Sequence, residues 1–206
     1  MYRFRYEIPA GDGEPVHRFE GNLERRRCIG VTDGEQCHRW ISIGLPYCAP
    51  HMVTEAHLRV QPSLIPDAGK GLFAYDPSQP EGALVFERHA LICMYGGEII
   101  DEEERFRRYR HGTAPYGCLA NGNRMLFEDA ALVRGVGAMA NHAVLPNAKI
   151  STTISQRGPC TLRALRDIFN NTEILVDYNA GAFGDDNLFE FDGEHFAETV
   201  HNFPAH

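Results

Sequence analysis

The 206-residue sequence lacks any long hydrophobic run. Its apolar stretches, such as residues 90–94, are too short to cross a bilayer. The segment that begins at Met1 also lacks the apolar core of a signal peptide. We therefore expect an intracellular protein without a membrane span, and a nuclear location is compatible with this expectation.

An excess of positive charge is also missing. Twenty Lys and Arg residues stand against 28 Asp and Glu residues, which gives a formal net charge of −8. Proteins that bind the phosphate backbone need a basic surface, so direct nucleic-acid binding is not expected. The negative charge suits a basic, lysine-containing protein or peptide partner, although it can equally serve solubility. The length predicts one main domain with a small appendage.

No Gly-x-Gly-x-x-Gly motif is present, which removes support for a Rossmann cofactor site. Short apolar segments separated by Gly- and Pro-containing turns instead predict small β-sheets. We expect strand pieces within residues 58–65, at 72–74, at 83–86 and along 90–100. A short helix is predicted over 101–111, with Asp101 as its N-cap.

Cysteine is sparse but unevenly distributed. Cys28, Cys37 and Cys48 precede His51 with the spacing Cys-x8-Cys-x10-Cys-x2-His. Three thiols and an imidazole are the ligand types of a structural zinc site. A disulfide pair with a free thiol is disfavoured in an intracellular protein, and unrelated cysteines are a further alternative. His38 is the alternative fourth ligand, but it directly follows Cys37, and adjacent residues rarely bind one ion with good geometry.

The turn formers between these ligands predict loops without a helix or sheet of their own, and the triple arginine at 25–27 is expected to be solvated surface. The remaining cysteines, Cys93, Cys118 and Cys160, are isolated in the sequence. We expect them to be small buried residues.

Several motifs follow one another in the second half of the chain. They are Gly69-Lys-Gly-Leu-Phe-Ala74, Tyr95-Gly-Gly-Glu-Ile-Ile100, Asp129-Ala130, Asn141-His142 followed by Pro146-Asn147, Leu165-Arg-Asp-Ile168, and Glu173-Ile-Leu-Val-Asp-Tyr178. Together they resemble, in order, the motifs of the SET-domain protein lysine methyltransferases over about residues 57–180.

The resemblance implies a mainly β, α+β fold in which small sheets surround a pseudoknot-like core. It places the SET-like domain at 57–180, after an N-terminal arm at 1–27 and the Cys3His zinc segment at 28–51. The aromatic tail at 181–206 is then a candidate lid over the cofactor and substrate.

The resemblance further implies methyl transfer from S-adenosylmethionine to lysine side chains of a basic protein, for which a histone tail is one candidate. Tyr178 would be the catalytic tyrosine and Tyr95 a second aromatic wall of the lysine channel. Asn147, Glu173 and Asp177 are expected to brace the surrounding loop. The residues expected to bind the cofactor are Lys70, Gly71, Leu72, Asn141 and His142.

The sequence departs from the family pattern beside these residues. Ala143 and Val144 replace a Ser-Cys pair, and Arg134-Gly135 and Ala138-Met139 stand where many members carry Gly-Asn and Arg-Phe. These departures leave an alternative function, which is a catalytically weak or inactive SET-like module that binds peptides, with the zinc segment as the recognition element.

Overall fold

The computed structural model describes residues 25–42, 45–109, 117–119, 126–151 and 160–178. It also gives the backbone of two antiparallel strands, β1 (Tyr2–Ile8) and β2 (His17–Leu23). The aromatic tail, for which a lid function is predicted, lies outside the described residues. No helix in the described ranges is long and apolar enough to cross a membrane.

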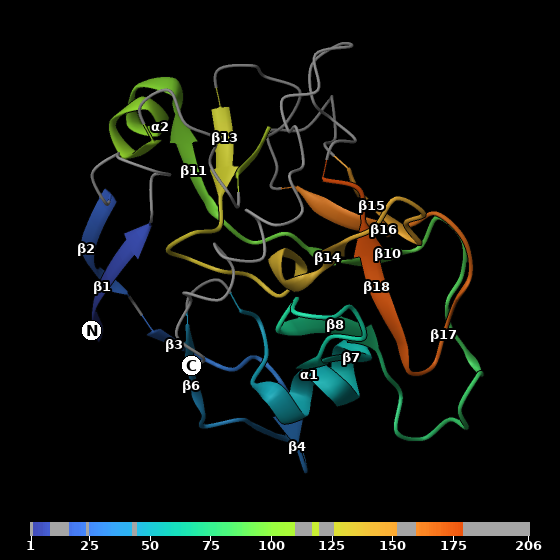
Figure 1. Cartoon of the computed structure of the whole chain (residues 1–206). Coiled ribbons are helices and arrows are strands. Elements are labelled where there is room, and N and C mark those ends of the chain that lie inside the picture. The colour runs from blue at the N-terminus through green and yellow to red at the C-terminus, as the bar shows by residue number, and fades with distance from the viewer. Residues whose placement is uncertain are drawn as a thin grey trace.

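The described part of the chain is mainly β with two short α-helices, as the sequence predicts, and its strands form several small sheets (Figure 1). The helices are α1 (Ala49–Ala56) and α2 (Glu102–Tyr109), and a 3-10 turn, η1, covers Gly137–Met139. The first strands are β3 (Arg25–Arg27), β4 (Val31–Thr32), β5 (Glu35–Gln36), β6 (Trp40–Ser42), β7 (Leu58–Pro62), β8 (Lys70–Ala74), β9 (Leu84–Phe86) and β10 (Leu91–Met94). The later ones are β11 (Glu98–Asp101), β12 (Gly117–Leu119), β13 (Leu126–Asp129), β14 (Asn141–His142), β15 (Ala148–Ser151), β16 (Thr161–Ala164), β17 (Ile168–Phe169) and β18 (Thr172–Val176).

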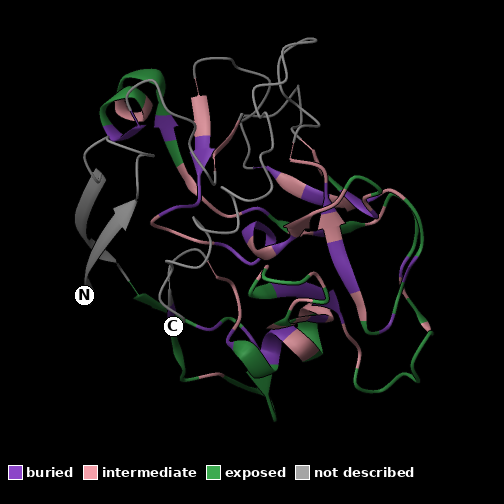
Figure 2. Cartoon of the chain, in the orientation of Figure 1, coloured by how far each residue is buried: buried purple, intermediate pink, exposed green. Residues whose placement is uncertain are grey.

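A four-stranded sheet in the order β14-β18-β8-β7 carries three of the six motifs, which are those that begin at Gly69, Asn141 and Glu173. β18 pairs antiparallel with β8 and parallel with β14, so it lies between the Gly-Lys-Gly strand and the Asn141-His142 segment. Leu72, Phe73, Ile174 and Val176 on its two inner strands are at most 1% exposed. Burial of these side chains stabilises the sheet (Figure 2), because removing apolar surface from water drives folding.

Two chain segments far apart in sequence cross closely beside this sheet. The backbone N–H of Gly135 donates a hydrogen bond to the carbonyl of Gly96. A Cβ atom at Gly135 would lie 2.3 Å from the Tyr95 carbonyl oxygen, and one at Gly137 would lie 2.6 Å from the Met94 carbonyl oxygen. Gly135 belongs to the Arg134-Gly135 pair that differs from the family pattern. Glycine is required there because two backbones approach each other closely.

Helix α2 begins as predicted, because the Asp101 carboxylate accepts the backbone N–H of Glu104 at 2.8 Å. Hydrogen bonds from Arg107 and Arg108 lower the pKa of Glu104 to about 2. Arg108 is buried and also donates to Glu98 at 2.8 Å and to Asp129 at 3.0 Å. This buried network fixes the helix to the sheet formed by β11, β13 and β12.

Some local predictions are wrong. Leu64 and Ile65 lie in a turn after β7, and the expected strand over 90–100 is split into β10 and β11. The split follows from Gly96, whose φ of 81° ends the extended run. The metal-ligand segment (28–51), expected to have no elements of its own, contains β4, β5, β6 and the start of α1. β4 pairs with β5 inside the segment, and β6 pairs with β3, which precedes it.

Candidate functional site

Glu173 on β18 is the centre of a polar cluster between the β7–β8 turn and β14. Its side chain is 4% exposed. One carboxylate oxygen accepts the Ser63 hydroxyl at 2.7 Å and the Asn141 amide at 2.9 Å, and the other accepts the Leu64 backbone N–H at 2.8 Å. A carboxylate that accepts three donors holds the β7–β8 turn and β14 against β18 in one fixed arrangement.

The glycine turn and Asn141 meet at this cluster. The Asn141 amide also donates to the Lys70 carbonyl at 3.2 Å. A Cβ at Gly71 would lie 2.1 Å from a Glu173 carboxylate oxygen, so Gly71 is required by the approach of Glu173. Gly69, by contrast, has a φ of 67°, which is the left-handed conformation of a turn. Lys70 is exposed and Leu72 is fully buried in the core.

Asn147 holds the loop between β14 and β15 against the same strand. Its side-chain amide donates to the Glu173 carbonyl at 2.7 Å, and its amide oxygen accepts the Leu175 N–H at 2.8 Å. The predicted bracing by Asn147 and Glu173 is therefore present. Asn141 and His142 form a short β-strand, because they pair with Leu175 and Val176.

Tyr178 is the second residue after the end of β18 and is fixed at two points. Its hydroxyl donates to the Ala140 carbonyl at 2.9 Å, and its backbone N–H donates to His142 Nδ1 at 3.1 Å. Because Nδ1 accepts this bond, the ring proton of a neutral His142 lies on Nε2. His142 Nδ1 also lies 3.7 Å from an Asp177 carboxylate oxygen, and this contact is an ion pair only when the ring is protonated. The centroids of the His142 and Tyr178 rings lie 5.4 Å apart.

Tyr95 lies after β10, in the segment that crosses Gly135. It is 6% exposed and belongs to the main core cluster, against which Tyr178 and Met139 also pack. Its backbone N–H donates to the Cys160 carbonyl at 2.8 Å. Buried Glu128 accepts the next two N–H groups, those of Gly96 and Gly97, at 2.9 and 2.8 Å. Tyr95 is therefore held by its backbone as well as by packing.

The four residues of the Cys3His pattern come together. His51 Nδ1 lies 3.3 Å from the Cys28 sulfur and 3.4 Å from the Cys48 sulfur, and the Cys37 and Cys48 sulfurs are 4.0 Å apart. All four ligand atoms lie within 4.8 Å of one another. In a zinc tetrahedron with bonds of about 2.1 and 2.3 Å, neighbouring ligand atoms are about 3.5–3.8 Å apart. The donor set and spacing therefore fit a zinc ion.

Second contacts orient this set. The Thr32 hydroxyl lies 2.9 Å from His51 Nε2, the ring nitrogen that remains for a second partner when Nδ1 binds a metal. Burial raises the pKa of the Cys28 thiol, but hydrogen bonds from the Cys48 and Gly30 N–H groups and from His51 outweigh it and lower the pKa to about 7. His38 Nδ1 lies 2.7 Å from an Arg27 guanidinium nitrogen, outside the set of converging ligand atoms.

The metal-ligand segment is joined to the main core through α1. His51 and Met52 are neighbours on this helix, and Met52 belongs to the main core cluster. Leu45 and Tyr47 pack against both this cluster and the small one formed by Cys28, Ile41 and Cys48. The helix then leads into β7, the strand that pairs with the Gly-Lys-Gly strand β8.

Sequence reasoning missed Ser63, Thr32 and Glu128 as supporting residues. For Ser63 the only sequence indication of a supporting role is its nearness to the glycine turn, since it stands six residues before Gly69. For Thr32 and Glu128 the sequence gives no indication, because their partners are distant in sequence. Cys160 is buried, as predicted, and Cys118 is half-buried; their sulfurs lie 3.0 Å apart, which the sequence does not indicate.

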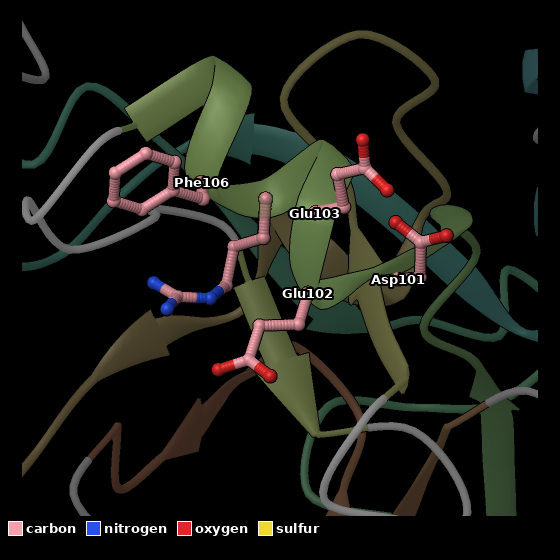
Figure 3. A pocket seen from close by; sticks show the side chains of 5 residues that line it. Asp101, Glu102, Glu103 and Phe106 are labelled. Carbon is pink, nitrogen blue, oxygen red and sulfur yellow. The ribbon is translucent and has the colours of Figure 1, made fainter.

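An open cavity of about 550 Å³ lies elsewhere, on α2. Asp101, Glu102, Glu103, Arg105 and Phe106 line it (Figure 3). None of these residues belongs to the clusters around Glu173 and Tyr178. We therefore assign the candidate site to the converging motifs and not to this cavity.

The SET domain family model matches residues 69–179, just over half of the chain, and the chain belongs to this family. Comparison with curated protein sequences finds no match. Among solved structures, the chain is similar to the Polycomb repressive complex 2 of Chaetomium thermophilum in an autoinhibited conformation bound to S-adenosylmethionine, with 20% identity and a TM-score of 0.50. The match covers 61% of this chain and 15% of that one. The methyltransferase domain of human histone-lysine N-methyltransferase SETMAR matches with 22% identity and a TM-score of 0.49, over 64% of this chain and 47% of that one.

Proposed function

We propose that the chain is an S-adenosylmethionine-dependent methyltransferase that modifies lysine side chains of a basic protein. The observation that carries this proposal is the fixed position of Tyr178, whose hydroxyl bonds the Ala140 carbonyl at 2.9 Å while its backbone is held by His142. Membership of the SET domain family supports it. The net charge of −8 suits a basic substrate, and a histone tail is one candidate.

The oxygens beside Tyr178 fit a cationic cofactor. When bound, S-adenosylmethionine supplies a methyl group activated by a positively charged sulfonium. The Tyr178 hydroxyl and the Ala140 carbonyl bring two oxygens together at a partly buried position, which favours a cation. We assign Lys70, Gly71, Leu72, Asn141 and His142 to cofactor binding. The support is that Asn141 joins the Lys70 carbonyl to Glu173, while His142, the next residue on β14, holds the backbone of Tyr178.

Tyr178 and Tyr95 would align the lysine amine with the methyl group. Alignment is the main requirement of a direct displacement, because positioning replaces a costly encounter of two reactants. The amine must be neutral, and a lysine side chain has an ordinary pKa of about 10.4. Burial against Tyr95 and a nearby positive charge both lower that pKa, so deprotonation needs no dedicated basic side chain.

The Cys3His cluster would hold a structural zinc ion through Cys28, Cys37, Cys48 and His51. With all four positions filled by protein ligands, such a site stabilises the fold and leaves no open position for substrate. We place its effect on α1 and, through Met52, on the main core. We further propose an intracellular protein, with the nucleus as the compartment if histones are its substrate.

Binding of S-adenosylmethionine, measured by isothermal calorimetry, tests this function. We expect one site per chain, and we expect Asn141→Ala to weaken binding about tenfold or more. The reason is that Asn141 bonds both the Lys70 carbonyl and Glu173, and loss of one to two such bonds costs about 1.5 kcal/mol.

Lys149→Ala, at an exposed position on β15, is the control and should bind like the wild type. No heat of binding in the wild type, together with binding of lysine-rich peptides, would instead favour the peptide-binding module. The departures at Arg134-Gly135 and Ala138-Met139 motivate that second candidate.

A further inference from the structure

We propose that Cys118 and Cys160 form a reversible disulfide under oxidising conditions and are a redox-sensitive modification site. Cys118 lies on β12, and Cys160 directly precedes β16, 42 residues later. Both are thiols in the structure, and their sulfurs are 3.0 Å apart. A disulfide bond is about 2.0 Å long, so the sulfurs need to approach by only about 1 Å.

A metal ion is the competing use of this pair, because the Glu128 carboxylate lies within 4.8 Å of both sulfurs. The 3.0 Å distance between the two sulfurs argues against a bound metal ion. Two thiolates on one zinc ion are about 3.8 Å apart, and the Cys37–Cys48 pair of the Cys3His cluster shows 4.0 Å. The carboxylate of Glu128 is also engaged by three backbone N–H groups, those of Gly96, Gly97 and Cys160.

The position of the pair gives the disulfide a structural consequence. Cys118 faces Glu128 in the β12–β13 pairing, and the Cys160 carbonyl accepts the backbone N–H of Tyr95. A bond between the sulfurs would join the sheet of β11, β13 and β12 to the segment that holds Tyr95. Its effect on methyl transfer rests on the proposed function, but its formation does not.

The reaction is thiol–disulfide exchange with a small disulfide such as oxidised glutathione. The half-buried Cys118, as thiolate, attacks one glutathione sulfur, so that the glutathione disulfide breaks and one glutathione leaves as thiolate. Cys160, as thiolate, then attacks the Cys118 sulfur and releases the second glutathione. Two protein thiols are oxidised with loss of two protons, and one glutathione disulfide is reduced to two thiols.

The pair should react slowly at neutral pH. The hydrogen bond with Cys160 and burial raise the pKa of the Cys118 thiol well above its ordinary value. The thiolate fraction below that pKa rises tenfold per pH unit, so exchange should accelerate about tenfold from pH 7.5 to 8.5.

The test uses the full zinc-loaded chain in glutathione redox buffers, followed by peptide mapping by mass spectrometry without reduction. We expect a Cys118–Cys160 linked peptide that disappears with dithiothreitol and is missing in Cys118→Ser. Cys93→Ser, which removes a cysteine outside both clusters, should retain it. Persistence of both thiols, or only glutathione adducts on them, would overturn the inference.

Two further readouts complete the test. Metal analysis should give one zinc per chain in both the wild type and Cys118→Ser, and a second zinc lost in the variant would show a metal site instead. Methyl transfer by the oxidised wild type should fall threefold or more and recover on reduction, while Cys118→Ser should be insensitive to oxidised glutathione. An absence of transfer in both redox states would contradict the proposed function, and the linked peptide would still decide the disulfide.

Discussion

Glu173→Ala is expected to lower the melting temperature by about 6–12 °C and to abolish measurable S-adenosylmethionine binding. The substitution leaves three donors without their acceptor: the Ser63 hydroxyl, the Leu64 N–H and the Asn141 amide. Each hydrogen bond lost from the buried carboxylate costs about 1 kcal/mol or more, which gives about 3 kcal/mol in total. For a chain of this length, 1 kcal/mol corresponds to about 2–4 °C. Differential scanning calorimetry measures the shift.

Two variants sharpen this prediction. Glu103→Ala removes an exposed carboxylate on α2 and should change the melting temperature by less than about 2 °C. Glu173→Gln keeps the shape of the side chain but turns an amide donor toward one of the three donors. Its melting temperature should therefore lie between those of the wild type and the alanine variant. A melting temperature of Glu173→Ala equal to that of the control would contradict the central bracing role of this carboxylate.

Zinc removal, by chelation or by Cys48→Ser, is expected to unfold the metal-ligand segment. Structural zinc contributes about 10 kcal/mol or more of apparent binding free energy. The small buried group of Cys28, Ile41 and Cys48 is too limited to replace it. Loss of order in α1 would also withdraw Met52 from the main core, at a cost of about 2–5 kcal/mol, the range for removing a buried methionine side chain.

Metal analysis and thermal unfolding measure this effect together. The wild type should carry one zinc per chain, and Cys48→Ser should carry none and unfold at a lower temperature. Cys93→Ala leaves the ligand set intact and should keep the metal. A metal-free wild type with the same melting temperature as the loaded protein would refute a structural zinc site.

The sequence predicted features that depend on local chemistry or on motif order. The Asp101 cap depends on neighbouring residues, and the hydrogen bond to the Glu104 N–H is present. The Cys3His set depends on spacing, and the four ligand atoms converge. The ordered motifs predicted a SET-type fold, and the family match confirms it. The individual site assignments, such as Tyr178 and Asn141, remain predictions.

Features that depend on pairing between distant segments were not predicted. The proximity of Cys118 and Cys160 follows from the placement of β12 and β16 in different sheets, for which the sequence carries no local signal. The need for glycine at position 71 arises from the close approach of Glu173, about a hundred residues later, and no local pattern indicates this approach. The supporting roles of Ser63 and Thr32 also depend on partners that are distant in sequence, which are Glu173 and His51.

The most direct test of the central claim is transfer of a labelled methyl group from S-adenosylmethionine to a panel of lysine-rich peptides, with the products identified by mass spectrometry. Tyr178→Phe keeps the ring that packs beside His142 and removes the hydroxyl bonded to the Ala140 carbonyl. We expect methylated lysine with the wild type. With Tyr178→Phe we expect a rate that is lower by a factor of about 100 or more, because misplacement of the reacting atoms has an effect of that size. Cofactor binding without methylated lysine on any peptide, or equal rates for the two proteins, would contradict it.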